Sequence, residues 1–240
     1  MITETMTDGE VYGIVKKTLD KYLRVVIDYA LPKFKAKRFP TTLTWHREDI
    51  KNNWEVYIIY KFPTKQHYKN RMAGNNAIDR FMKVNSLRVP VYYTIGYAYK
   101  GYVREPVPPF VTSYSMHLLS RMRERNPEYK DMTDIQLMLE LSSICATSVR
   151  TKHDQNIWLM GDGSVVYAKN NWDDGVVHFF TYIHTSQVPQ YRYDMTDQEY
   201  ESLIEQRRRC METEADYRQH VDAIQLGRRL YTLINSNRRM

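Results

Sequence analysis

The sequence predicts an α+β fold in which antiparallel sheets pack against helices, with a long N-terminal helix and a helical C-terminal extension. Three observations support this prediction: a sustained helical periodicity near the N-terminus, extended segments rich in tyrosine and β-branched residues, and short strands joined by turns of glycine and aspartate. With 240 residues, of which 42% are hydrophobic, the chain is long enough to bury a proper core.

The N-terminal helix is expected over residues 8–31. Apolar residues recur there at intervals of three and four, the spacing of one helix face, at Val11, Ile14, Val15, Leu19 and Leu23. Thr7 or Asp8 can cap the first turn, and Pro32 ends the helix because proline lacks the amide that the next turn needs.

The segment that follows this helix concentrates positive charge between two phenylalanines. Its four cations are Lys33, Lys35, Lys37 and Arg38. Lysine and arginine neutralise backbone phosphates, and Phe34 or Phe39 can stack on a base, so these residues are a predicted nucleic-acid contact. The alternative is a solvated connector that the two phenylalanines anchor.

The rest of the N-terminal half is predicted to be mostly extended. Its elements are strands at 43–45, 54–62 and 89–103, a loop at 65–76 and one or two helical turns at 77–84. The proline-rich residues 106–110 indicate a boundary. The chain is therefore expected to comprise an α+β half at 1–105, a helix pair plus β-meander at 106–190 and C-terminal helices at 191–240, or to form one compact domain.

The second half is predicted to hold two helices and a small meander. The elements are helices at 113–125 and 133–146 and strands at 156–168 and 176–184. The first of these strand segments folds back across Gly161-Asp162-Gly163, because glycine and aspartate accept the positive φ of a tight turn. Further on, Thr196 and Glu199 form a capping-box pattern that predicts the first C-terminal helix.

Charge and cysteine content indicate the kind of partner and compartment. The formal net charge of +7 favours anionic partners such as nucleic acid. Cys145 and Cys210 are far apart in the chain and are expected to be free thiols. The acidic N-terminus lacks a signal-peptide pattern, and no apolar run reaches the ~20 residues that span a bilayer, which predicts a cytoplasmic protein without membrane contact, or a virion component.

Residues 113–125 contain the most distinctive pattern of functional groups. His117, Arg121 and Arg125 are spaced four apart and so share one face of the predicted helix, with Arg123 on a flank as a further nucleic-acid contact. An imidazole exchanges a proton near neutral pH, and an arginine binds phosphate with two parallel hydrogen bonds.

Metal-free RNA cleavage requires a base, an acid and cations that stabilise the phosphorane. His117 and Arg121 can supply these functions, and Thr181 or Tyr182 can donate the remaining hydrogen bond from the strand at 176–184. The alternative is an ordinary surface helix, in which the arginines pair with neighbouring acids such as Glu124.

Residues 111–186 resemble the barnase, EndoU, colicin and RelE group of small RNases and toxins. The matching pattern is Ser113 or Ser115, His117, Arg121 and Arg125 on a helix, followed by strands that reach Tyr182. The resemblance implies a helix beside an antiparallel sheet, RNA as substrate, and catalytic residues on these two elements.

The sequence leaves two functions open. The first is a nucleic-acid-binding protein, RNA being the expected ligand, with a ribonuclease-like activity as an extension of it. The second is a non-enzymatic interaction or assembly protein of a phage, virion or mobile element, which would use the C-terminal helices to bind a protein partner or itself. The other histidines show no metal-ligand spacing, so neither a metal nor a cofactor is expected.

Overall fold

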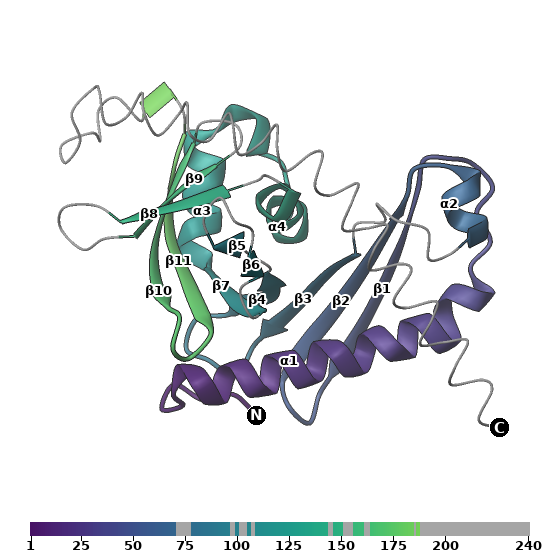
Figure 1. The fold of residues 1–240 in the computed structure, drawn as a ribbon, viewed down its shortest axis with the longest axis horizontal. Helices are drawn as coiled ribbons and strands as arrows, with labels where there is room; N and C mark the ends of the chain where they lie inside the picture. The colour runs from purple at the N-terminus through teal and green to yellow at the C-terminus, as the bar shows by residue number, and fades with distance from the viewer. Residues whose placement is uncertain are drawn as a thin grey trace.

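The computed structural model describes residues 1–70, 78–96, 99–100, 105–106, 109–143, 146–150, 156–160, 164–184 and 186–187. Nine of the described strands form one sheet of order β1-β2-β3-β4-β7-β11-β10-β9-β8, with helices on both of its faces (Figure 1). These strands are β1 (Thr41–Asp49), β2 (Trp54–Phe62), β3 (Ile78–Val84), β4 (Val91–Gly96), β7 (Phe110–Ser115), β8 (Ala146–Arg150), β9 (Asn156–Met160), β10 (Val165–Asn171) and β11 (Val176–Ile183). Two short strands, β5 (Tyr99–Lys100) and β6 (Glu105–Pro106), form a separate pair.

The sheet confirms the predicted α+β class and its mostly antiparallel character. β7 and β11 are the exception, because they pair in parallel after the chain has passed through two helices and strands β8 to β10. The meander of β9, β10 and β11 is antiparallel, as predicted. The expected C-terminal helices fall on residues 191–240, which lie outside the described residues.

One face of the sheet is covered by the long N-terminal helix, which is also confirmed. α1 (Asp8–Val25) continues into a π-helical turn, η1 (Val26–Ala30), and a 3₁₀ turn, η2 (Leu31–Lys33). Thr7 caps it as predicted, and the Glu10 carboxylate accepts a hydrogen bond from the Thr7 amide at 2.8 Å. The Val15 and Leu19 side chains of α1 are completely buried between the helix and the sheet, so this face holds one apolar core.

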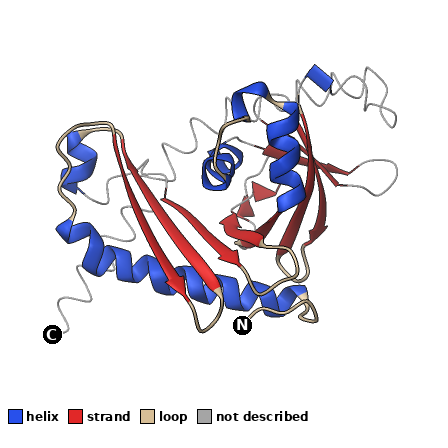
Figure 2. Ribbon diagram, turned by 180° about the vertical axis from the view of Figure 1, so that it is seen from behind, coloured by secondary structure: helices blue, strands red, loops and turns tan. Residues whose placement is uncertain are grey.

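The opposite face holds a second core beneath two shorter helices. α3 (Met116–Arg125) packs on β11, and a 3₁₀ turn, η3 (Pro127–Tyr129), leads to α4 (Asp134–Ser143). Both helices bury leucine and methionine side chains, namely Leu118, Leu119, Met122, Leu137 and Met138. Seen from behind, α3 lies over the part of the sheet that contains β7 and β11, α4 lies beside α3, and β1 and β2 extend away from both helices (Figure 2).

The structure corrects the predictions for residues 77–84 and for the start of the helix at residue 113. Residues 77–84 were expected to form helical turns, but 78–84 form strand β3, which pairs with β2 and β4 in the interior of the sheet. The predicted helix start at residue 113 is also wrong, because β7 runs to Ser115 and the Ser115 hydroxyl then caps α3. β4 and β7 pair directly, so the sheet continues across the predicted boundary at residues 105–106.

Among the residues that the structure describes, no helix has both the length and the apolar character needed to cross a bilayer.

Candidate nucleic-acid interface and polar network

The end of the molecule near η2 brings together two segments that contain no acidic residue. Residues 29–47 and 61–78 both lack aspartate and glutamate. The first contains the predicted cations, all four of which are exposed, and the second contains exposed Lys65 and Lys69. We call this set the basic end; it comprises Lys33, Lys35, Lys37, Arg38, Lys65 and Lys69.

Aromatic packing holds the two segments side by side. The second segment contains the short helix α2 (Lys65–Asn70), where a loop was expected. The Tyr68 ring lies 5.8 Å from the Phe34 and Phe39 rings, and the Tyr68 hydroxyl donates a hydrogen bond to the Phe34 carbonyl. The Phe34 ring also stacks on Phe62 of β2 at 6.0 Å. α2 therefore lies at the same end of the molecule as η2 (Figure 1).

This arrangement combines the two alternatives that the sequence left open for residues 33–39. Phe34 and Phe39 anchor the connector, as the plainer alternative requires, and both rings are half-buried. The same anchoring fixes the backbone while the intervening lysine and arginine side chains remain exposed. A partner at this end would meet positive charge from two elements, without a neighbouring carboxylate from either segment.

The predicted catalytic residues of α3 occupy different environments. His117 is exposed and, within the described residues, makes no hydrogen bond or ion pair. Arg121 pairs with Glu124 at 2.6 Å between Nη1 and Oε2, as the surface-helix alternative expected. Arg125 donates from Nη1 to the Tyr182 carbonyl oxygen at 2.5 Å.

Arg123, the predicted flanking contact, is held on the other side of α3. Its Nε donates to the Met132 carbonyl at 3.0 Å, and its Nη2 pairs with the Asp134 carboxylate. The guanidinium therefore joins α3 to the start of α4.

A β-bulge at Phe180 precedes the two predicted hydroxyl residues of β11. The register of β10 against β11 skips Phe180, so the alternation of side chains shifts and Tyr182 joins Val177 and Phe179 in the α3-side core. Tyr182 is completely buried, with its ring 6.2 Å from Tyr129, whereas Thr181 is half-buried. Of the five predicted catalytic residues, Arg125 and Tyr182 are linked by a hydrogen bond, which uses the backbone carbonyl of Tyr182.

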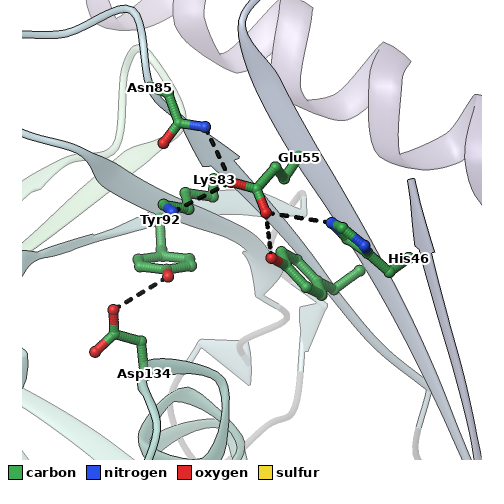
Figure 3. A network of polar contacts seen from close by, with 7 residues as sticks. His46, Glu55, Lys83, Asn85, Tyr92 and Asp134 are labelled. Carbon is green, nitrogen blue, oxygen red and sulfur yellow. Dashed lines mark hydrogen bonds and ion pairs between the residues drawn. The ribbon is translucent and has the colours of Figure 1, made fainter. Parts of the chain in front are cut away.

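A different group of polar side chains gathers around Glu55 on β2. The Glu55 carboxylate accepts hydrogen bonds from Asn85 at 3.0 Å and Lys83 at 3.2 Å, and its Oε2 lies 3.2 Å from His46 Nε2 (Figure 3). The Tyr57 hydroxyl donates to the same carboxylate. We call His46, Glu55, Tyr57, Lys83 and Asn85 the Glu55 network.

The network lies where helical cover of this face ends. The strand register places His46 opposite Tyr57 and Lys83 opposite Tyr92, all on the face that α3 and α4 occupy. Tyr92 is buried and donates to Asp134 of α4 at 3.2 Å, whereas 46% of the His46 side chain is exposed on the outermost strand. The network is therefore covered near Tyr92, where α4 packs on the sheet, and accessible to solvent near His46 on β1.

The electrostatics of the network keep Glu55 ionised. Partial burial by itself raises the pKa of the carboxyl, but hydrogen bonds from Tyr57, Asn85 and Lys83 outweigh it and lower the pKa to about 2. Burial and the neighbouring Glu55 charge raise the pKa of Tyr57, which therefore keeps its proton. At neutral pH the network is a carboxylate held by donors, with an exposed imidazole beside it.

Sequence reasoning missed this network because it treated His46 as one of several scattered histidines. A usable signal was present in the chain between the predicted strands at 43–45 and 54–62, which are close enough to pair as a hairpin. Pairing Asp49 with Trp54 across the turn places His46 opposite Tyr57, one diagonal step from Glu55. Counting the hairpin register would have predicted the contact between His46 and Glu55.

A third polar group connects α1 to the sheet. The His178 ring lies 2.7 Å from the Ser113 hydroxyl through Nδ1 and 3.0 Å from the Asp8 carboxylate through Nε2. Partial burial raises the pKa of Asp8, but hydrogen bonds from Asn171 and His178 outweigh it, and the pKa is lowered. Ser113 is buried in the middle of β7. Because a nucleophile must be accessible, this arrangement is better explained as an anchor for the first turn of α1.

Searches against protein-family models, curated proteins and solved structures find no match. The resemblance of residues 111–186 to small RNases and toxins stays a prediction. Over the described part of the chain, no group of three histidine, cysteine, aspartate or glutamate side chains is placed to hold a metal ion.

Proposed function

We propose that this protein binds nucleic acid, with RNA as the ligand, through the basic end. The supporting observation is that two acid-free segments meet at the basic end, where six cations are exposed. Clustered lysine and arginine side chains neutralise phosphates and release condensed counterions, which is the main source of sequence-independent affinity for nucleic acids.

The aromatic anchors determine the kind of recognition. Phe34, Phe39 and Tyr68 pack on one another, so the exposed groups that this end offers are mainly charged. Contacts of this kind position a backbone without reading its sequence. Exposed hydroxyls of Thr42 and Thr44 follow the basic segment on β1, where they can bind ribose 2′-hydroxyls, and this supports RNA over DNA.

The test is binding of a fluorescein-labelled 20-nucleotide single-stranded RNA, followed by fluorescence anisotropy at 50 mM salt. One variant removes the four cations of the first segment: Lys33→Ala, Lys35→Ala, Lys37→Ala and Arg38→Ala. We expect its affinity to fall by about tenfold or more, because four phosphate contacts are removed.

A matched control removes the same charge from exposed positions elsewhere: Lys17→Ala, Lys51→Ala, Arg88→Ala and Lys130→Ala. This control should bind nearly as well as the wild type. Equal affinity of the two variants, or a wild-type protein that does not bind at low salt, would contradict the proposal. DNA of the same sequence should bind more weakly than RNA.

A further inference from the structure

The orientation and hydrogen bonding of His46 are those of a general base. Its ring stacks on Tyr57 with centroids 4.4 Å apart and an interplanar angle of 21°, which restricts its rotation. Nε2 is 3.2 Å from the Glu55 carboxylate, so a neutral imidazole places its proton on Nε2 and its lone pair on Nδ1 (Figure 3). Within the described residues, Nδ1 has no hydrogen-bond partner.

Glu55 fixes this tautomer of the neutral ring. Lys83, Asn85 and Tyr57 hold the carboxylate in place, so it remains an acceptor directed at His46. A carboxylate in contact with an imidazole stabilises the imidazolium that forms when the ring takes a proton. The pair therefore has the features of an oriented base, and 46% of the His46 side chain is exposed.

Strand β1 leads from the basic end to His46. β1 begins three residues after Arg38, and Thr42, Thr44 and His46 alternate along it, all exposed and on one face. From Thr41 to His46 the strand spans roughly 17 Å at about 3.3 Å per residue. This corresponds to about five steps of a stacked nucleic-acid strand at 3.4 Å each. A strand bound at the basic end can therefore extend to His46.

We propose that His46 cleaves RNA that is bound at the basic end, with Glu55 as its positioning residue. This inference rests on the proposed function. The substrate class is a ribose phosphodiester, because the reaction uses the adjacent 2′-hydroxyl as nucleophile.

The reaction is a transesterification that needs no co-reactant. His46 Nδ1 takes the 2′-hydroxyl proton while the 2′ oxygen forms a bond to phosphorus. The bond from phosphorus to the 5′ oxygen breaks, and the imidazolium returns its proton to that oxygen. The products are a 2′,3′-cyclic phosphate and a 5′-hydroxyl, so atoms, charge and electrons balance and His46 is regenerated.

The charged groups on this face predict how the site should respond to substitution. They include Glu48 on β1, Glu55 and Lys61 on β2, Asp79 and Lys83 on β3 and Asp134 on α4. Glu48 is exposed and lies opposite Glu55 in the register, so its charge opposes the approach of a phosphate. Glu48→Gln should therefore increase the cleavage rate severalfold.

The experiment follows cleavage of the labelled 20-nucleotide RNA in EDTA and identifies cyclic-phosphate ends by mass spectrometry. Without the 2′-hydroxyl, DNA of the same sequence should remain intact. His46→Ala should lower the rate by about 100-fold or more while RNA binding is retained. His184→Ala, which removes a histidine from the end of β11, should cleave at the wild-type rate.

Glu55→Gln tests the positioning role separately. It should lower kcat while KM for the RNA stays unchanged, because the imidazole loses the carboxylate that orients it and the basic end still binds the RNA. A merely structural role would lower the fraction of folded protein and leave kcat per folded molecule unchanged. An unchanged kcat therefore overturns the role of Glu55.

The remaining outcomes separate this inference from the proposed function. A wild-type protein that binds RNA but leaves it intact overturns the inference and leaves the proposed function standing. Absence of binding overturns both. If His117→Ala abolishes cleavage and His46→Ala does not, the reaction belongs to α3 and the assignment to His46 is wrong.

Discussion

Replacing Glu55 by glutamine should destabilise the fold in a pH-dependent manner. Glutamine has nearly the same shape as glutamate, so the substitution removes the charge and leaves the packing of β2 in place. Tyr57, Lys83 and Asn85 lose a carboxylate acceptor, and Lys83 also loses the negative charge 3.2 Å from its ammonium nitrogen.

The magnitude follows from the pKa of Glu55. A reduction from 4.5 to about 2 corresponds to an upper limit of about 3.4 kcal/mol, at 1.36 kcal/mol per pH unit. The carboxylate lies at the open margin of the sheet, where solvent screens its interactions, so we expect about 1–2 kcal/mol at pH 7. Because the folded-state pKa is lowered, this stability is fully present above pH 4.5 and is lost as the pH falls toward 2.

The assay is urea unfolding followed by tryptophan fluorescence, with wild type and Glu55→Gln compared at pH 7, 5, 4 and 3. The difference between their free energies of unfolding should be largest at pH 5 to 7 and should shrink below pH 4.5. A difference of the same size at all four pH values, or no difference at pH 7, would refute the electrostatic reasoning and assign Glu55 a packing role alone.

Three further substitutions test the packing of α1 and of the β10–β11 turn, each by the same unfolding assay. Leu19→Ala removes a completely buried side chain from the core beneath α1 and should lower the free energy of unfolding by about 2–5 kcal/mol; a loss below 1 kcal/mol would mean that α1 is not docked as described. Asp20→Asn removes the carboxylate 2.8 Å from the Arg80 guanidinium, which is 10% exposed, and should cost about 1–3 kcal/mol, whereas an unchanged stability would show that this ion pair is dispensable. Gly175→Ala forces a Cβ into a backbone with φ of +70° and within 3.1 Å of the Tyr12 ring, so a cost of about 1–2 kcal/mol is expected, and a stabilised variant would contradict that backbone geometry.

The sequence predicted those elements whose signals are local. The period of α1, its Thr7 cap and the β9–β11 meander all depend on spacing within one segment. β3 escaped prediction because it is an interior strand with a mixed pattern. Its Arg80 is satisfied by Asp20 of α1, sixty positions away in the chain, and neither periodicity nor propensity reports such a distant partner.

In the candidate sites, too, the features that depend on local spacing could be predicted and those that depend on distant contacts could not. Lys33 to Arg38 form one continuous segment, so their exposure together could be anticipated, but Lys65 joins them only because Tyr68 packs on Phe34. On α3, the spacing of His117, Arg121 and Arg125 is as predicted for one helix. The bulge at Phe180, which directs Tyr182 into the core, is a tertiary feature without a sequence signature in this chain.

The most direct test of the central claim, that the basic end binds nucleic acid, is the salt dependence of RNA affinity. The logarithm of the binding constant should fall linearly with the logarithm of salt concentration, with a slope of about −0.7 per phosphate contacted on single-stranded RNA. Removing the cations at positions 33, 35, 37 and 38 should make that slope shallower by about 3, whereas the scattered four-cation control should leave it nearly unchanged. Equal slopes for all three proteins would show that phosphates do not contact the basic end.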